Sequence, residues 1–351
     1  MKCVAIGDIF ITPDMMRGAV EKFTDLIDHC QYFYFGLNNR KAMRDTVKTI
    51  ERGDRDKLEL PVGLLDAVSD AEVVMVHLCP VTDKVIAAAP KLKYILCNRG
   101  GVENVDVAAA TARGVIVMNN PAHNANACAE FVIGQMLCET RNITRSCMAL
   151  KNGTWREKYP NSDNIVEMKD LTVGVVGFGN IGELVCEKLS AFGCKMLVCT
   201  RSVHPKNNSK IAWERLSFVD FETLLQESDI ITCHVRGKST DILFGRREFE
   251  LMKPNCYFIN TSRSCYVDMN ALYEALNGDE IRGAALDVFD TEPLGPSYPF
   301  LELDNVTLTN HRAGDTVNSY ADSPAMMLTE LKKLVVEHMC PKFVVNKEVT
   351  K

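Results

Sequence analysis

Residues 171–182, with the sequence LTVGVVGFGNIG, constrain the fold more than any other segment of this chain. The segment begins with a short apolar run, which is typical of a parallel strand covered on both faces. Three glycines, Gly177, Gly179 and Gly182, follow at the G-x-G-x-x-G spacing, and a helical pattern begins directly after them. A strand, a glycine turn and a helix in this order predict a parallel α/β sheet with a nucleotide-binding turn.

Each glycine has its own physical role in such a turn. Gly177 permits the tight turn, Gly179 leaves room for a pyrophosphate beside the backbone, and Gly182 lets the helix pack closely on the strand. The N–H groups of Asn180 and Ile181, at the positive end of the helix dipole, would face the phosphates. An ordinary glycine-rich loop has the same spacing, but the strand and helix around this one favour a dinucleotide site.

Composition limits the partners that the chain can have. Its 351 residues have room for two domains of ordinary size. A formal net charge of -6 argues against nucleic acid or an anionic membrane as the main partner, so we expect a small molecule. No spacing of His, Cys and Asp residues suggests a metal site.

The cysteines indicate a reducing compartment. Fourteen of them could form a disulfide framework, but no C-x-x-C pair occurs. Cys97, Cys199 and Cys233 lie in apolar strand patterns, where a thiol behaves as a small hydrophobe. The N-terminus has no long apolar segment, and no apolar run reaches the length of about eighteen residues that a membrane span needs. These patterns predict a cytoplasmic protein.

Strand and helix patterns alternate along the chain on both sides of residues 124–151, which form one long helical pattern. Alternation of this kind predicts an α/β protein with two doubly wound lobes. A final helix at about 323–338 returns most simply to the first lobe.

Three residues after expected strands could carry out chemistry on a 2-oxo acid: Arg263, Glu292 and His311. An arginine can hold a carboxylate through two parallel hydrogen bonds and polarise the neighbouring carbonyl. A histidine can give a proton to the nascent alkoxide, and a carboxylate on its other nitrogen orients it and favours the imidazolium. Taken singly, these residues are more simply explained as a solvated loop cation, a turn residue and a core histidine.

From about residue 73 to 314, the chain resembles the D-isomer-specific 2-hydroxyacid dehydrogenases. The matching segments are GFGNIG, MKPNCYFINTSRSCYVD, GAALDVFDTEPL and NVTLTNHRAG. The resemblance implies that Arg263 binds substrate, that His311 is the acid/base residue, and that Glu292 orients the histidine. It also implies that Asp287 lies near the nicotinamide carboxamide.

The resemblance further implies an architecture and a substrate loop. A Rossmann dinucleotide-binding domain, residues 120–310, is inserted in a flavodoxin-like catalytic domain made of residues 1–119 and 311–351. The backbone N–H groups of the loop Arg99, Gly100, Gly101 and Val102 meet the substrate carboxylate. A homodimer is expected through the 124–151 helical region.

Three positions depart from the family pattern. Ser264 replaces the glycine that usually follows the arginine, Arg236 stands where a proline is commoner, and Arg312 stands where an apolar residue is usual. These departures bear on the identity of the substrate rather than on the reaction.

We therefore expect an NAD(P)-dependent 2-hydroxyacid dehydrogenase that acts mainly as a reductase of small 2-oxo acids. A dinucleotide-sensing binding protein, like the corepressors that share this fold, is the alternative. Glyoxylate, hydroxypyruvate, phosphohydroxypyruvate and bulkier 2-oxo acids all remain open as substrates.

The end of the second strand predicts NADP(H) rather than NAD(H). An NAD site places an acid there, about twenty residues beyond the glycine turn, to bind the ribose 2′-hydroxyl. Here the strand ends in Thr200, Arg201 and Ser202, without an acid. Arg201 can pair with a 2′-phosphate, and the two hydroxyls can donate to it. The alternative is that Arg201 points into solvent and that NAD is used.

Overall fold

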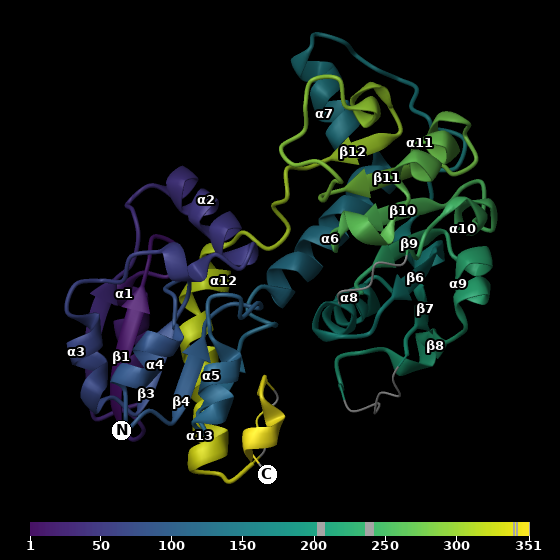
Figure 1. Cartoon of the computed structure of the whole chain (residues 1–351). Helices are drawn as coiled ribbons and strands as arrows, with labels where there is room; N and C mark the ends of the chain where they lie inside the picture. The colour runs from purple at the N-terminus through teal and green to yellow at the C-terminus, as the bar shows by residue number, and fades with distance from the viewer. Residues whose placement is uncertain (202–207, 236–241, 340, 342, 351) are drawn as a thin grey trace. The chain divides into compact units, whose positions relative to one another are not determined.

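The computed structural model describes residues 1–201, 208–235, 242–339, 341 and 343–350. The chain divides into two compact units, one made of Met1–Asn124 with Thr316–Lys351 and the other of Ala125–Asp315. Each unit is built on its own parallel sheet (Figure 1). Both boundaries lie a few residues after the predicted ones at 119/120 and 310/311.

Unit 1 has a five-stranded sheet in the order β2-β1-β3-β4-β5, in which every neighbouring pair is parallel. The strands are β1 (Lys2–Gly7), β2 (His29–Tyr34), β3 (Val73–Val76), β4 (Tyr94–Cys97) and β5 (Ile116–Asn119). The helices are α1 (Pro13–Val20), α2 (Arg40–Glu51), α3 (Leu64–Ala67), α4 (Asp83–Ala88), α5 (Val107–Ala112), α12 (Val317–Ala321) and α13 (Ser323–Val335).

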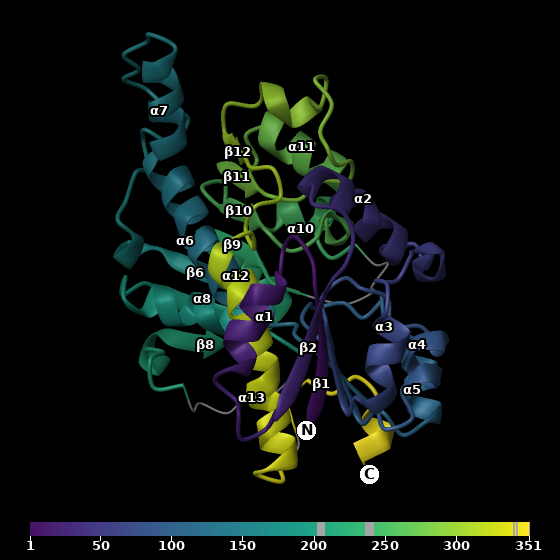
Figure 2. The same cartoon turned by 90° about the vertical axis from the view of Figure 1, so that its left-hand side faces the viewer.

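Helices cover both faces of the unit 1 sheet because side chains alternate along each strand. Val74 and Val76 of β3 pack with α2, α3, α4 and α5, whereas Val73 and Met75 pack with α1 and α13. Figure 2 shows α1 and α13 side by side on their face of the sheet. The C-terminal segment therefore returns to the first lobe, as the sequence predicts.

Unit 2 has a seven-stranded parallel sheet in the order β12-β11-β10-β9-β6-β7-β8. The strands are β6 (Thr172–Val176), β7 (Lys195–Cys199), β8 (Leu216–Phe218), β9 (Ile230–Cys233), β10 (Tyr257–Asn260), β11 (Gly283–Leu286) and β12 (Val306–Leu308). The helices are α6 (Ala125–Arg141), α7 (Ile143–Lys151), α8 (Asn180–Ser190), α9 (Phe221–Glu227), α10 (Arg246–Glu250) and α11 (Met269–Asn277).

The strand order of unit 2 reverses at β6, since β7 lies on one side of it and β9 on the other (Figure 1). Open parallel sheets bind their ligands beside such a reversal, at the carboxyl ends of the strands. Helices α6 and α8 cover one face, and α9, α10 and α11 cover the other. The predicted pair of doubly wound α/β lobes is confirmed.

The predicted helix over residues 124–151 is two helices, α6 and α7. Asn142 separates them with a left-handed backbone, φ 55°. Asparagine tolerates this conformation better than most residues, and here its side-chain amide donates to Asn161 Oδ1 at 2.6 Å. The apolar pattern continues through the break, which is why the sequence shows a single helix.

No helix in the described part of the chain is both long and apolar enough to cross a bilayer. The cysteines in the same part of the chain are all free thiols.

Candidate active site

The glycine turn after β6 has the geometry that its spacing predicts. Gly177 has a left-handed φ of 97°, and a Cβ there would lie 2.8 Å from the carbonyl oxygen of His234. A Cβ on Gly182 would overlap the carbonyl oxygen of Gly177, so only glycine lets α8 pack this closely on the turn. By contrast, a Cβ on Gly179 would meet no described atom within 4 Å.

The first turn of α8 is suited to an anion. Gly179 is the N-cap residue, and the first intrahelical hydrogen bond runs from Glu183 N to Gly179 O at 3.0 Å. The N–H groups of Ile181 and Gly182 precede this bond and therefore have no intrahelical acceptor. These donors, together with the open space beside Gly179, fit a dinucleotide pyrophosphate.

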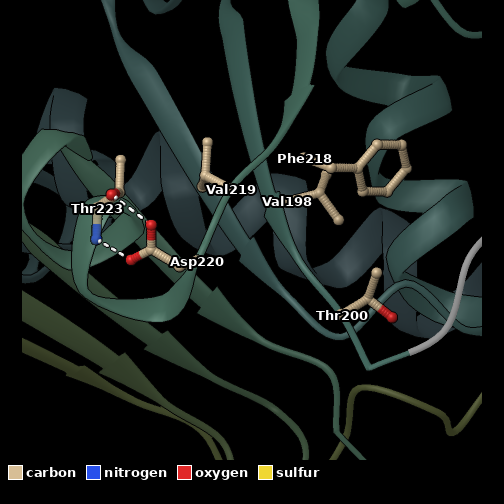
Figure 3. Close-up of a pocket in the computed structure, with 6 residues that line it drawn as sticks. All are labelled: Val198, Thr200, Phe218, Val219, Asp220 and Thr223. Atoms are coloured by element: carbon tan, nitrogen blue, oxygen red, sulfur yellow. Dashed lines mark hydrogen bonds between the residues drawn. The ribbon is translucent and has the colours of Figure 1, made fainter.

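A pocket of about 430 Å³ lies at the carboxyl ends of β7 and β8 (Figure 3). It is lined by Val198, Thr200, Phe218, Val219, Asp220 and Thr223. Thr200 is thus at the position where the dinucleotide pattern places its ribose-binding group. Arg201 is exposed next to it, whereas Ser202 lies outside the described residues.

Asp220 is an acid of this pocket that the sequence analysis did not select. Its carboxylate accepts hydrogen bonds from Thr223 N at 2.9 Å and Thr223 Oγ1 at 2.7 Å, and so caps α9 (Figure 3). These bonds hold the pKa of Asp220 below its usual value. The residue follows β8 rather than β7, so a search for an acid after the second strand does not find it.

Arg263, Glu292 and His311 follow three neighbouring strands, β10, β11 and β12. These strands are parallel, so the loops that carry the three residues leave the sheet at the same edge. His311 Nδ1 lies 2.8 Å from Glu292 Oε2. The pair is partly open to solvent, with side chains 50% and 36% exposed, as a substrate-accessible acid/base pair requires.

The Glu292 carboxylate is fixed by backbone as well as by the histidine. Its Oε1 accepts from Phe289 N at 3.0 Å. Ser264, the residue after Arg263, donates its hydroxyl to Phe289 O at 2.9 Å. A continuous series of contacts therefore joins the arginine loop to Glu292 and His311, and the unusual serine is part of it.

Arg263 is exposed, and its Nη1 donates to Ser262 O at 2.7 Å. The buried Asn260 shapes the loop, because its Oδ1 accepts from Ser262 N at 3.0 Å and its Nδ2 donates to Arg263 O at 3.2 Å. The guanidinium of Arg263 therefore extends from a loop whose backbone is hydrogen-bonded to Asn260.

Asp287 is fully buried and holds the histidine loop. Its carboxylate accepts from Thr309 Oγ1 at 2.7 Å and from the N–H groups of Arg312 and Ala313, each at 2.9 Å. These contacts fix the backbone directly after His311, in addition to the place near the nicotinamide carboxamide that the family resemblance implies for Asp287. The side chain of Arg312 pairs with Asp315 at 2.6 Å. Arg236 lies outside the described residues.

The loop of residues 99–102 in unit 1 is anchored by its carbonyl oxygens. Asn120 N donates to Arg99 O at 2.9 Å, and Asn119 Nδ2 donates to Gly100 O at 2.6 Å. Within the described part of the chain, the N–H groups of Gly101 and Val102 have no acceptor. The loop can therefore offer these two donors to an anion.

The side chain of Arg99 points toward two carboxylates of unit 1. It is 13% exposed, and its Nη2 lies 3.6 Å from both Glu51 and Glu103. These carboxylates compete with any anionic ligand for the guanidinium, so the contribution of Arg99 to this loop is its backbone.

Comparisons with known proteins agree with this geometry. Residues 133–313 match the family model described as the NAD-binding domain of D-isomer-specific 2-hydroxyacid dehydrogenases. The glyoxylate reductase of Thermofilum pendens is 36% identical over 280 residues, covering 78% of this chain and 82% of that protein. The glyoxylate reductase of Thermococcus litoralis is 35% identical, covering 82% and 87%.

A D-3-phosphoglycerate dehydrogenase of Archaeoglobus fulgidus is 39% identical over 235 residues, but only 43% of its length is covered. Among solved structures, the NAD complex of the D-isomer-specific 2-hydroxyacid dehydrogenase from Lactobacillus delbrueckii ssp. bulgaricus has a TM-score of 0.75 at 22% identity, covering 99% of this chain and 100% of that one. At this identity the structural likeness shows the fold alone.

The matches confirm the resemblance, and they favour a dehydrogenase over a dinucleotide-sensing binding protein. The chain belongs to the D-isomer-specific 2-hydroxyacid dehydrogenase family, and it is an oxidoreductase that uses a nicotinamide dinucleotide.

Proposed function

We propose that the protein reduces a small 2-oxo acid to the D-2-hydroxy acid, with His311 as the proton donor. The observation that carries the proposal is the 2.8 Å contact between His311 Nδ1 and Glu292 Oε2, on the same sheet edge as the Arg263 loop. With Nδ1 held by the carboxylate, Nε2 is the nitrogen that remains for the substrate.

Each residue of the site has a separate role in the proposed reduction. The nicotinamide dinucleotide supplies the hydride when it is bound at the glycine turn. His311 Nε2 gives its proton to the carbonyl oxygen as that oxygen gains negative charge. Glu292 keeps the imidazole in this orientation, and Arg263 binds the substrate carboxylate and polarises the carbonyl. In unit 1, the free N–H groups of Gly101 and Val102 support a second role for the loop, as donors to the carboxylate.

Small 2-oxo acids are proposed as substrates because two relatives, of whose length the chain covers 82% and 87%, are glyoxylate reductases. The test is the loss of absorbance at 340 nm when the protein is mixed with reduced cofactor and glyoxylate, hydroxypyruvate, pyruvate or a bulkier 2-oxo acid. Arg263→Ala should lower kcat/KM at least roughly 100-fold, because two charged hydrogen bonds are lost.

His311→Ala should slow reduction by roughly 100-fold to 10,000-fold, because the general acid is lost. Cofactor affinity should stay the same, because His311 is not part of the glycine turn that binds the dinucleotide. Cofactor binding without turnover of any 2-oxo acid would instead support a binding protein. Near-normal kinetics of Arg263→Ala would remove that residue from the site.

We further propose that NADPH is preferred over NADH. Support comes from the exposed Arg201 beside Thr200, and from the engagement of Asp220 with the N-terminus of α9. Arg201→Ala should weaken NADPH binding by roughly 10-fold to 150-fold and change NADH binding little. Thr200→Asp should weaken NADPH binding and strengthen NADH binding, because its carboxylate would repel a 2′-phosphate and accept a hydrogen bond from a 2′-hydroxyl. Equal effects of Arg201→Ala on both cofactors would contradict this assignment.

A homodimer through α6 and α7 is also proposed. Three large apolar side chains of α7, Ile143, Met148 and Leu150, are more than half exposed in the single chain. Burial of such side chains stabilises association. Sedimentation should show a dimer for the wild type and a monomer for the Met148→Glu, Leu150→Glu double variant. A wild-type monomer would refute the proposal.

A further inference from the structure

A second histidine–carboxylate pair lies in unit 1, apart from the residues used above. Asp8 follows β1 and His77 follows β3, and these two strands are neighbours in the sheet. His77 Nδ1 lies 2.8 Å from Asp8 Oδ2 and 3.1 Å from Oδ1. Asp8 is fully buried, and the His77 side chain is only 8% exposed.

The Asp8 carboxylate is fixed by the backbone around it. It accepts from Phe10 N at 2.9 Å and from Ile11 N and Leu78 N, each at 3.2 Å. A carboxylate oxygen can only accept a hydrogen bond, so the Nδ1 of His77 carries the hydrogen in this pair. The tautomer and the direction of the ring are therefore set by Asp8.

The other ring nitrogen, Nε2, is left without a partner. No described residue forms a hydrogen bond with it, and it is not among the buried unpartnered atoms of the described chain, so it reaches the surface. The rings of Phe10 and Tyr320 flank the imidazole edge-on, with centroids 6.2 and 6.3 Å away. A ring that is held on one side by Asp8 and whose other nitrogen reaches the surface can bind a ligand there.

Asn98 and Asn104, on either side of the loop of residues 99–102, connect this loop to the end of β3 and to His77. Asn104 Nδ2 donates to His77 O at 3.2 Å and to Cys79 O at 3.1 Å. Asn98, at the start of the loop, donates to Val76 O through its N at 2.7 Å and its Nδ2 at 3.0 Å. The open nitrogen therefore belongs to the same sheet edge as the N–H groups assigned to the substrate carboxylate.

We infer that His77 is a specificity-determining residue that recognises a hydroxyl group on C3 of the 2-oxo acid, with Asp8 as its positioning residue. The inference rests on the proposed function. With Nδ1–H fixed on Asp8, Nε2 accepts a hydrogen bond when the ring is neutral and donates one when it is charged. A hydroxyl can serve as partner in both states, whereas a methyl group can serve in neither.

Hydroxypyruvate and pyruvate differ only in this hydroxyl, and they are the matched probes. The wild type should prefer hydroxypyruvate over pyruvate in kcat/KM by about 10-fold to 100-fold, because a site built to bind a hydroxyl discriminates against the analogue that lacks it. In His77→Leu this ratio should fall to about 3 or less, mainly through a rise in KM for hydroxypyruvate. His77→Gln keeps a polar group of similar reach and should retain part of the preference.

His29→Leu is the control, since the same substitution is made at an exposed histidine at the amino end of β2, far along the strand from this edge. Its substrate ratio should equal that of the wild type. Thermal unfolding of each variant shows whether it is folded. If His77→Leu does not fold, the inference is tested by the ratio of kcat/KM for hydroxypyruvate to that for pyruvate in the wild type and in His77→Gln.

Two results would overturn the inference while leaving the proposed function intact. One is a wild type that reduces hydroxypyruvate and pyruvate equally well. The other is a folded His77→Leu in which kcat/KM for hydroxypyruvate, pyruvate and glyoxylate falls by one common factor, which would show a purely structural role. A wild type that reduces no 2-oxo acid would instead refute the proposed function itself.

Discussion

Alanine substitutions at Gly182 and Gly179, in the same turn, should separate the stability of the fold from its affinity for the cofactor. A Cβ on Gly182 overlaps the carbonyl oxygen of Gly177 and lies 3.1 Å from its carbonyl carbon. These are backbone atoms rather than the end of a flexible side chain, so α8 has to move as a whole. Overpacking of this kind costs about 1–3 kcal/mol, and the better helix propensity of alanine offsets up to about 1 kcal/mol.

We therefore expect Gly182→Ala to lose about 1–2 kcal/mol of unfolding free energy. For a unit of this size, that loss corresponds to a fall in Tm of roughly 2–8 °C. Gly179→Ala should change the unfolding free energy by less than about 0.5 kcal/mol, because its Cβ meets no described atom within 4 Å and its φ of -95° suits alanine. Its Cβ does fill the space assigned to the pyrophosphate, so cofactor Kd should rise at least about 10-fold.

The assay is thermal unfolding of each variant without cofactor, combined with titration of NADPH fluorescence. A ligand at 100 times its Kd adds about 2.7 kcal/mol of apparent stability, so the cofactor-induced shift in Tm gives an independent measure of affinity. Wild-type cofactor affinity in Gly179→Ala, or a wild-type Tm in Gly182→Ala, would refute the reasoning.

Three further predictions concern residues of unit 2. Glu292→Gln should lower kcat about 10-fold or more, since a charged hydrogen bond to His311 is lost, and leave NADPH Kd unchanged in a fluorescence titration. Ser264→Ala should lower kcat by about 2-fold to 10-fold with little change in KM, measured at saturating cofactor, because one bond between the catalytic loops disappears. Burial lowers the pKa of His234 to about 3. The folded state therefore has its full stability above the pKa of the unfolded chain, about 6.5, and loses stability as the pH falls from there toward 3. His234→Asn should therefore lose less unfolding free energy between pH 7 and pH 4.5 than the wild type, by roughly 1–3 kcal/mol in urea titrations.

The strands that are easiest to recognise in the sequence are those covered on both faces. Every residue of β3, β9 and β10 is buried, and the sequences of these strands are largely apolar. Two other strands, β2 and β8, are edge strands with several exposed residues. Edge strands bury less of each side chain, so they have no continuous apolar run to detect.

Those residues of the candidate site that belong to short sequence motifs could be predicted from the sequence. The glycine spacing and the order of Arg263, Glu292 and His311 locate groups on strand ends, which a parallel sheet brings to one edge. The contacts between these loops were not predictable, because they depend on how separate loops pack. The bond from Ser264 to Phe289 O joins positions 25 residues apart, and only the folded backbone reveals it.

The conformation of His311 depends on contacts that its sequence motif does not reveal. His311 has a left-handed backbone, φ 56°, which is unfavourable for a residue with a Cβ. Two separate carboxylates compensate for this: Glu292 holds the imidazole, and Asp287 accepts the N–H groups of Arg312 and Ala313 directly after it. Since Asp287 is fully buried, its hydrogen bonds to the loop are shielded from water and correspondingly strong. The direction of the His311 imidazole is thus set by Asp287 as well as by Glu292, and this contact is compatible with the place near the nicotinamide carboxamide that the family resemblance implies for Asp287.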